Sequence, residues 1–464
     1  MPDSASAPAT FDSTMVQLRP RPEPAGREAP AARPAVREHP SKLFVEVTTR
    51  CNLRCPMCVK RVPGSAICDS DLSEEIFGRL APAFPNLSAL ILNGIGEPLL
   101  HPRLEPFILQ AKEAMPAGSD IAFQTNGVLL SRDRAESLVR AGVDRICISL
   151  DALSPQLIRA IRPGADLGRV EQAFKNLADA KRRLGSATPS VGLEFVVMRD
   201  NHAELPDVVA WAAERGVGFI IVTQMMPYHP SAAGAAAHRT STDRATALFE
   251  KWKARAAADG VDLGRYFDVF MRFHRNPEEQ KIVDYANALF EEAHREGVFL
   301  RMENLLDQRG DALQRSVEEA FQKAEERAKA SGISLTLPRL APTHQRRCDF
   351  VEDGGAFVSW DGKVHPCYFL WHGYRCYVGG FEKRVKPAVL GDLASGEDIL
   401  EVWRRKESRL FRQNVVKYDF PFCYDCSFAL CDYAQAEDFE QDCYMSAVPC
   451  GSCLWCTGLF HCLR

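Results

Sequence analysis

The residues with the clearest chemical potential are three cysteines, Cys51, Cys55 and Cys58, in the segment CNLRCPMC. They are separated by three and two residues and directly follow a short apolar run. Structural zinc sites use four ligands, and the next cysteine, Cys68, comes ten residues after Cys58. Three thiolates favour a [4Fe–4S] cluster in which one iron stays open to a reactant. A zinc site or a loop of incidental thiols is the alternative.

Glycine and polar residues follow the next three apolar runs of the chain. The second run leads into NGIGEPLLHP (93–102), the third into QTNG (124–127), and the fourth ends in SLD (149–151). Glycine allows the backbone to approach a bound group closely, and a carboxylate pairs with an ammonium group. The candidate binding residues in and just after these segments are Gly94, Gly96, Glu97, Thr125, Asn126, Ser149, Asp151 and Arg162.

Together these motifs resemble those of the radical S-adenosylmethionine (radical SAM) enzymes, although Met57 stands where that family usually has an aromatic residue. The resemblance covers residues 42 to about 230 and implies a [4Fe–4S] cluster on Cys51, Cys55 and Cys58. It implies that reductive cleavage of S-adenosylmethionine (SAM) yields a 5′-deoxyadenosyl radical, which abstracts hydrogen from the substrate. The same resemblance implies that Glu97, with Gly94 and Gly96, receives the methionine amino group of SAM. It implies that the nucleoside and substrate cavity is lined by Thr125, Asn126, Ser149 and Asp151. It also implies that Arg162 holds the SAM carboxylate or ribose.

Eleven of the sixteen cysteines lie after residue 347. Cys348, Cys367, Cys423 and Cys426, with their flanking residues, resemble the SPASM/twitch extension of radical SAM maturases, which implies an auxiliary [4Fe–4S] cluster on these four thiols. We expect one or two auxiliary clusters, the second with ligands drawn from Cys431, Cys443, Cys450, Cys453, Cys456 and Cys462. A zinc knuckle is the alternative, since four-cysteine sets suit both metals.

The elements that must position these groups follow an alternating pattern. Short β-branched runs predict strands, amphipathic stretches between them predict helices, and the alternation predicts a parallel sheet covered on both faces. The predicted strands are 43–47, 88–93, 120–125, 144–150, 191–198 and 217–224, and the predicted helices between them are 73–84, 104–115, 132–142, 168–184 and 204–216. Six such units predict an α/β fold, a partial (β/α)6 barrel of the radical SAM type.

The rest of the chain divides by composition. We expect a disordered Pro/Ala/Arg-rich leader over 1–41, the barrel over 42–230, a helical extension over 231–340 and a small Cys-rich, SPASM-like iron–sulfur domain over 341–464. In the extension, 245–258, 280–297 and 311–332 predict helices and 334–338 a strand. In the Cys-rich domain, 355–360 predicts a strand and 397–413 one helix.

Charge and hydropathy exclude several classes of protein. The chain of 464 residues has 57 basic and 61 acidic residues, a net charge of −4, so no nucleic-acid partner is expected. No apolar run approaches the ~18 residues that cross a bilayer, and no secretory signal is apparent, so we expect a cytoplasmic protein with no membrane partner. Export by another route would instead favour disulfides.

The expected function is that of a radical SAM enzyme that modifies a peptide or protein substrate, or matures a metalloenzyme. A reducing partner such as ferredoxin or flavodoxin would supply electrons. Oxidation, epimerisation or bond formation on a small-molecule substrate is one alternative. A non-enzymatic iron–sulfur electron carrier is another, but a carrier needs neither an open iron nor Glu97.

Overall fold

The computed structural model describes residues 37–378, 381–424, 426, 441–447 and 449–463. Its main sheet contains the six predicted strands, each parallel to its neighbour and in sequence order. These are β1 (Lys42–Val45), β2 (Ala89–Ile91), β3 (Asp120–Thr125), β4 (Arg145–Ser149), β5 (Ser190–Val197) and β6 (Phe219–Gln224). The predicted α/β partial barrel with a parallel sheet is confirmed.

Two further strands extend this parallel run at its edges. β7 (Ser334–Thr336) pairs with β6, and β8 (Gly355–Val358), from the Cys-rich region, pairs with β1. β9 (Lys363–His365) and β12 (Gly391–Asp392) continue the sheet antiparallel beyond β8, giving ten strands in the order β12-β9-β8-β1-β2-β3-β4-β5-β6-β7. The Cys-rich segment therefore shares a sheet with the barrel.

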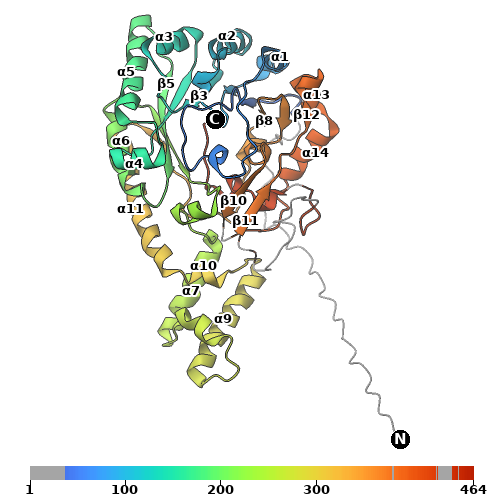
Figure 1. Cartoon of the computed structure of the whole chain (residues 1–464). Coiled ribbons are helices and arrows are strands. Elements are labelled where there is room, and N and C mark those ends of the chain that lie inside the picture. Colours follow the sequence, from blue (N-terminus) through green and yellow to red (C-terminus); the bar gives the residue numbers. More distant parts are fainter. Residues whose placement is uncertain (1–36, 379–380, 425, 427–440, 448, 464) are drawn as a thin grey trace. The chain divides into compact units, whose positions relative to one another are not determined.

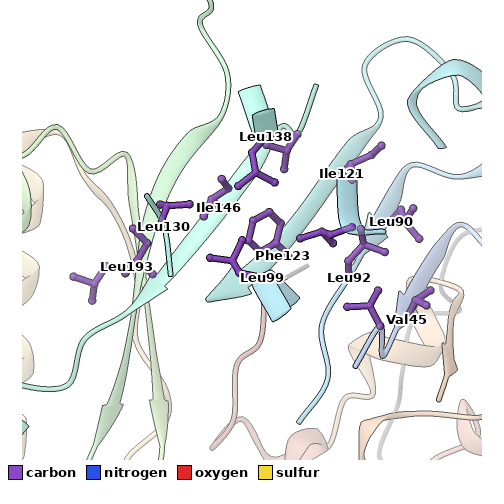
Figure 2. Packing of buried hydrophobic residues seen from close by; sticks show 14 of the residues in the cluster. Val45, Leu90, Leu92, Leu99, Ile121, Phe123, Leu130, Leu138, Ile146 and Leu193 are labelled. Carbon is purple, nitrogen blue, oxygen red and sulfur yellow. The ribbon is translucent and has the colours of Figure 1, made fainter. Parts of the chain in front are cut away.

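Helices lie along the outer side of these strands (Figure 1). They are α1 (Glu74–Gly78), α2 (Leu104–Ala114), α3 (Arg132–Ala141), α4 (Pro155–Ile161), α5 (Leu167–Leu184) and α6 (Leu205–Ala213). The sequence did not predict α4, which is only seven residues long. Between helices and sheet lies the main core, where Leu90, Phe123, Ile146 and Leu193 pack with their neighbours (Figure 2).

The strands present alternate residues to two different cores. Leu43 and Val45 of β1 belong to the helix-covered core, whereas Phe44 belongs to a second cluster inside the barrel. This period of two is what a strand imposes on successive side chains. The inner cluster comprises Phe44, Ala89, Ile91, Ala122, Cys147, Ile221, Phe357 and Leu463.

The helical extension has a core of its own. Its helices are α7 (Asp243–Ala258), α8 (Tyr266–Val269), α9 (Pro277–Arg295), α10 (Met302–Leu305) and α11 (Gln308–Ser331). Phe249, Trp252 and Leu289 pack in the core of the extension. α11 contacts α6 of the barrel. Within the described residues, no helix is both long and apolar enough to cross a membrane.

The C-terminal region contains α12 (Asp349–Glu352), a hairpin of β10 (Tyr374–Val378) and β11 (Phe381–Val385), α13 (Ile399–Arg404) and α14 (Lys406–Val415). The single helix predicted over 397–413 is wrong, because Arg405 has extended backbone (φ −57°, ψ 149°) and separates α13 from α14. Residues 1–36 of the predicted leader lie outside the described residues. Trp403 Nε1 donates to Arg37 O at 2.9 Å, so the described end of that segment contacts α13.

Candidate functional site

The three cysteines of CNLRCPMC lie in one loop directly after β1, as predicted. Cys58 N donates to Cys55 O at 3.0 Å, and Leu53 N approaches Cys51 Sγ at 3.5 Å. Burial raises the pKa of Cys51 and, to about 11, that of Cys55; the charges of the neighbouring thiols add to both shifts. Among the described residues no three His, Cys, Asp or Glu side chains already form a metal-binding group. The donor chemistry of the loop, three thiols within eight residues, nevertheless fits an iron–sulfur cluster.

Glu97 organises the ends of β2 and β3. Its Oε1 accepts from Thr125 Oγ1 at 2.6 Å and Leu99 N at 3.1 Å, and its Oε2 accepts from Asn126 N at 2.8 Å. Only 2% of Glu97 is exposed, and burial raises its pKa. Asn126 Nδ2 in turn donates to Asn52 Oδ1 at 2.8 Å, which links this carboxylate to the cysteine loop.

The two glycines before Glu97 are required by the chain itself. A Cβ on Gly96 would lie 2.3 Å from Thr48 O and 2.6 Å from Arg50 O, and a Cβ on Gly94 would lie 2.3 Å from Cγ of Glu46. Gly96 N and Glu97 N donate to those same two carbonyl oxygens, at 3.2 and 2.7 Å. From the sequence, these glycines are expected to let the backbone approach SAM closely. In the structure they already lie in close contact with the segment between β1 and the cysteine loop.

Asp151 and Arg162 form a buried ion pair next to this loop. Arg162 Nε donates to Asp151 Oδ2 at 2.5 Å, and Val196 N donates to Asp151 Oδ1 at 2.8 Å. Burial lowers the pKa of the Arg162 guanidinium. The charges of Asp151 and of the nearby Cys55 raise it by more, so the net shift is upward. The structure thus brings Arg162 beside the cysteine loop, where a fixed cation can meet a carboxylate.

A ring of polar side chains lies beyond the apolar inner cluster, toward the carboxyl ends of the strands. Its members are Glu46, Asn93, Gln124, Ser149, Glu194 and Thr223, and all of them except Glu194 follow a residue of that cluster by two positions. Asn93 and Gln124 are joined by hydrogen bonds of 2.9 and 2.6 Å. Burial raises the pKa of Glu194 to about 7, while Gln124 and Ser149 donate to its carboxyl group. Sequence reasoning found Ser149 but missed Glu46 and Glu194, although the period of two along the strands marks both.

Glu46 also connects the barrel to the Cys-rich region. It is fully buried, and its Oε1 accepts from Ile95 N at 3.1 Å. His372, which follows β9, places its Nε2 3.0 Å from Glu46 Oε2. One carboxylate therefore holds both the segment before Glu97 and a histidine from a distant part of the chain.

Seven of the ten described thiols after residue 347 fall into two sets, grouped by which thiols act on one another. The first set comprises Cys348, Cys367, Cys450 and Cys453. Burial raises the pKa of the first three of these thiols, and the neighbouring thiols of the set add to each shift. The second set comprises Cys423, Cys426 and Cys443; burial raises the pKa of Cys423 to about 11, and the other two thiols add to the shift. Of the predicted set, Cys348 and Cys367 thus belong to one group of interacting thiols, and Cys423 and Cys426 belong to the other. Cys431 lies outside the described residues.

Cys456 and Cys462 approach the first set. A cavity of about 50 Å³ is lined by both, together with Cys348, Cys367 and Cys453. Its remaining walls are largely aromatic, including Phe44 and Trp455. A thiol-lined cavity whose other walls are mostly aromatic suits an iron–sulfur cluster, whose potential depends on solvent exposure.

The segment 458–463 enters the barrel beside β6. Gln224 N donates to Leu459 O at 3.1 Å, and His461 N donates to Thr223 Oγ1 at 3.2 Å. Leu463 is fully buried in the inner cluster. Nothing in the sequence signalled this insertion, because the segment has no periodic pattern of its own.

Comparison with known proteins identifies two family models in the chain. The model of the radical SAM superfamily matches residues 45–224, and that of the SPASM iron–sulfur cluster-binding domain matches residues 348–427. The tungsten-containing aldehyde ferredoxin oxidoreductase cofactor-modifying protein of Pyrococcus furiosus is 26% identical over 425 residues, which cover 90% of this chain and 96% of that protein.

Other relatives match over a shorter range. The GTP 3′,8-cyclase of a Synechococcus species is 36% identical over 205 residues, which cover 39% of this chain and 56% of the cyclase. The chain therefore spans about half the length of that cyclase. Among solved structures, Streptococcus suis SuiB bound to S-adenosylmethionine aligns with a TM-score of 0.44 and 11% identity, over 81% of this chain and 68% of SuiB.

Proposed function

Because the chain belongs to the radical SAM superfamily and carries an iron–sulfur SPASM domain, we propose that it is a maturase that modifies a peptide or protein, or the cofactor of a metalloenzyme. Its cofactors are the SAM-binding [4Fe–4S] cluster, SAM and auxiliary iron–sulfur clusters. A one-electron donor such as ferredoxin or flavodoxin, in the cytoplasm, is part of the same proposal.

One observation carries the maturase assignment. The similarity to the cofactor-modifying protein covers 90% of this chain, whereas the similarity to the cyclase covers 39%. Substrate choice in a shared fold depends on the parts that differ between functions. Since the match to the cofactor-modifying protein is nearly full length, it must include most of the chain outside the barrel.

The residues of the barrel can each be given a task in this reaction. Cys51, Cys55 and Cys58 would hold the cluster that, with SAM, supplies a 5′-deoxyadenosyl radical. Glu97, fixed by three hydrogen bonds, would orient the methionine amino group, and Arg162, fixed by Asp151, would bind the SAM carboxylate or ribose. The apolar inner cluster excludes water from the floor beneath them.

A small-molecule substrate is the second candidate. It is favoured by the 36% identity, over the shorter range, to the cyclase, which is named for GTP. The polar ring inside the barrel also offers carboxylate and amide groups that can bind a polar substrate.

The first experiment tests radical generation. Anaerobically reconstituted protein should form 5′-deoxyadenosine from SAM under dithionite, and replacement of Cys51, Cys55 and Cys58 by Ala should abolish it. Cys68→Ala is the matched control, because Cys68 is exposed and outside the motif. Production at the wild-type rate in the triple variant would falsify the cluster assignment.

The second experiment tests the substrate class. Cells expressing wild-type or triple-variant protein should differ in the mass of a metalloenzyme polypeptide or of its extracted cofactor. A difference confined to unbound metabolites would reject the maturase and support the small-molecule candidate.

A further inference from the structure

Arg346 is a buried cation without an acidic partner among the described residues. It is 6% exposed, its guanidinium carbon lies 4.0 Å from the centre of the Phe422 ring, and its Nη2 donates to Pro421 O at 2.7 Å. Within the described residues, its buried Nη1 has no hydrogen-bond partner. A guanidinium group keeps its charge in a protein, so this cation must be balanced by something.

Lys383, on β11, is a second buried cation. It is 5% exposed, and its Nζ lies 5.8 Å from the centre of the Tyr424 ring and 3.5 Å from Ser452 O. In the part of the chain that the structure describes, neither cation is in an ion pair with a carboxylate. Burying a charge in this way is costly unless an opposite charge lies nearby.

The two cations lie where the two thiol sets meet. A Cβ on Gly451, next to Cys450 of the first set, would lie 2.8 Å from Pro421 O and 3.0 Å from Cys423 Sγ of the second set. Arg346 donates to that same Pro421 O, and Lys383 faces Ser452, next to Cys453. Arg346 therefore borders Cys423 of the second set and, through Gly451, Cys450 of the first set.

We propose that Arg346, assisted by Lys383, supplies the positive charge that compensates the thiolates of both auxiliary sites and raises the reduction potential of the clusters they hold. The proposal rests on the thiol sets defined above. Net charge and hydrogen bonds at the sulfurs are among the main factors that set such potentials. A cation between two anionic sites stabilises the reduced form of each, because the added electron increases the negative charge that the cation faces.

The test uses the full chain with Cys51, Cys55 and Cys58 replaced by Ala, so that only auxiliary clusters contribute to the spectra. In this background we compare Arg346→Gln, which removes the charge, with Arg346→Lys, which keeps it. Arg412→Gln is the matched control: Arg412 is also buried, stacks on Trp403 at 3.7 Å and donates to a backbone carbonyl, but no described thiol acts on it. Iron content and EPR-monitored redox titrations are the readouts.

We expect Arg346→Gln to lower the reduced-to-oxidised ratio of at least one auxiliary cluster about tenfold at a fixed potential, which is about 59 mV for one electron. Lys383→Met should shift it in the same direction, and Arg346→Lys and Arg412→Gln should change it little. Unchanged potentials at full iron content would overturn the proposal, as would equal shifts in Arg346→Gln and Arg346→Lys.

Cluster assembly provides a second criterion. If Arg346→Gln loses iron and Arg346→Lys retains it, the charge is what the site requires, which supports the proposal. If both lose iron equally, the shape of the guanidinium matters and not its charge, and the proposal is wrong. 5′-Deoxyadenosine formation in Arg346→Gln with Cys51, Cys55 and Cys58 intact reports on the proposed function separately.

Discussion

Replacement of Glu97 by Gln should destabilise the protein even in the absence of SAM. The Glu97 carboxylate accepts from Thr125, Leu99 and Asn126, and Glu97 itself is 2% exposed. A Gln amide can keep an oxygen for the first two donors, but its NH₂ then faces the Asn126 N–H. The loss of one charge-assisted bond predicts a cost of about 1.5–3 kcal/mol. Glu97→Ala would leave three buried donors without an acceptor, at about 1–3 kcal/mol each, which approaches the whole stability of a domain.

Urea unfolding of the protein without SAM, followed by a SAM titration of each variant, measures the two roles of Glu97 separately. Glu113→Gln, an exposed carboxylate on α2, is the control and should change neither quantity. SAM affinity should fall about tenfold or more in Glu97→Gln, since a charge-assisted bond of ~1.5–3 kcal/mol is lost at roughly 1.4 kcal/mol per decade. A Glu97→Gln protein with wild-type stability would refute the structural role argued from these three hydrogen bonds, whatever its SAM affinity.

Two other groups in the barrel, Arg162 and Glu194, predict changes in the free energy of unfolding whose direction the structure fixes. Arg162→Met should cost about 3–5 kcal/mol in urea unfolding because it leaves the buried Asp151 carboxylate without the Arg162 counter-ion, and a further Asp151→Asn change should recover part of that loss. For Glu194, whose folded pKa is raised to about 7, the native state retains a proton that the unfolded state releases, so stability should fall by about 3 kcal/mol as the pH rises from about 4.5 to 7. Glu194→Gln should flatten this dependence between pH 5 and pH 8; an unchanged slope would contradict the shift.

The strands and the order of the barrel could be predicted from the sequence because each is encoded locally. A β-branched run such as 120–125 forms β3 over the same residues, and amphipathic stretches form the helices between strands. β7 and β8 were expected as strands, but their membership of the barrel sheet depends on pairing with residues far away in the chain. A pattern of three or four residues carries no information about its partner.

The cysteines show the same division between local and distant information. The loop of Cys51, Cys55 and Cys58 is contained in eight residues, so spacing alone predicts that these thiols lie together. The sets after residue 347 depend on how residues 450–453 pack against residues 421–423, a contact in which Gly451 leaves no room for a side chain. Spacing therefore identifies the thiols but carries no information about these distant contacts.

Gly94 allows the role of distant contacts to be tested, because a contact that the sequence does not reveal explains why this residue is glycine. Its Cβ position lies 2.3 Å from Cγ and 2.9 Å from Cβ of Glu46, a fully buried residue. Gly94→Ala must displace the Glu46 carboxylate, which accepts from Ile95 N and contacts His372. In a double-mutant cycle with Glu46→Ala, the free energies of unfolding should therefore be non-additive by about 0.5–3 kcal/mol, with the double variant more stable than the sum predicts. Additivity within about 0.3–0.5 kcal/mol would contradict a clash with the part of the Glu46 side chain beyond Cβ, which is the part that Glu46→Ala removes.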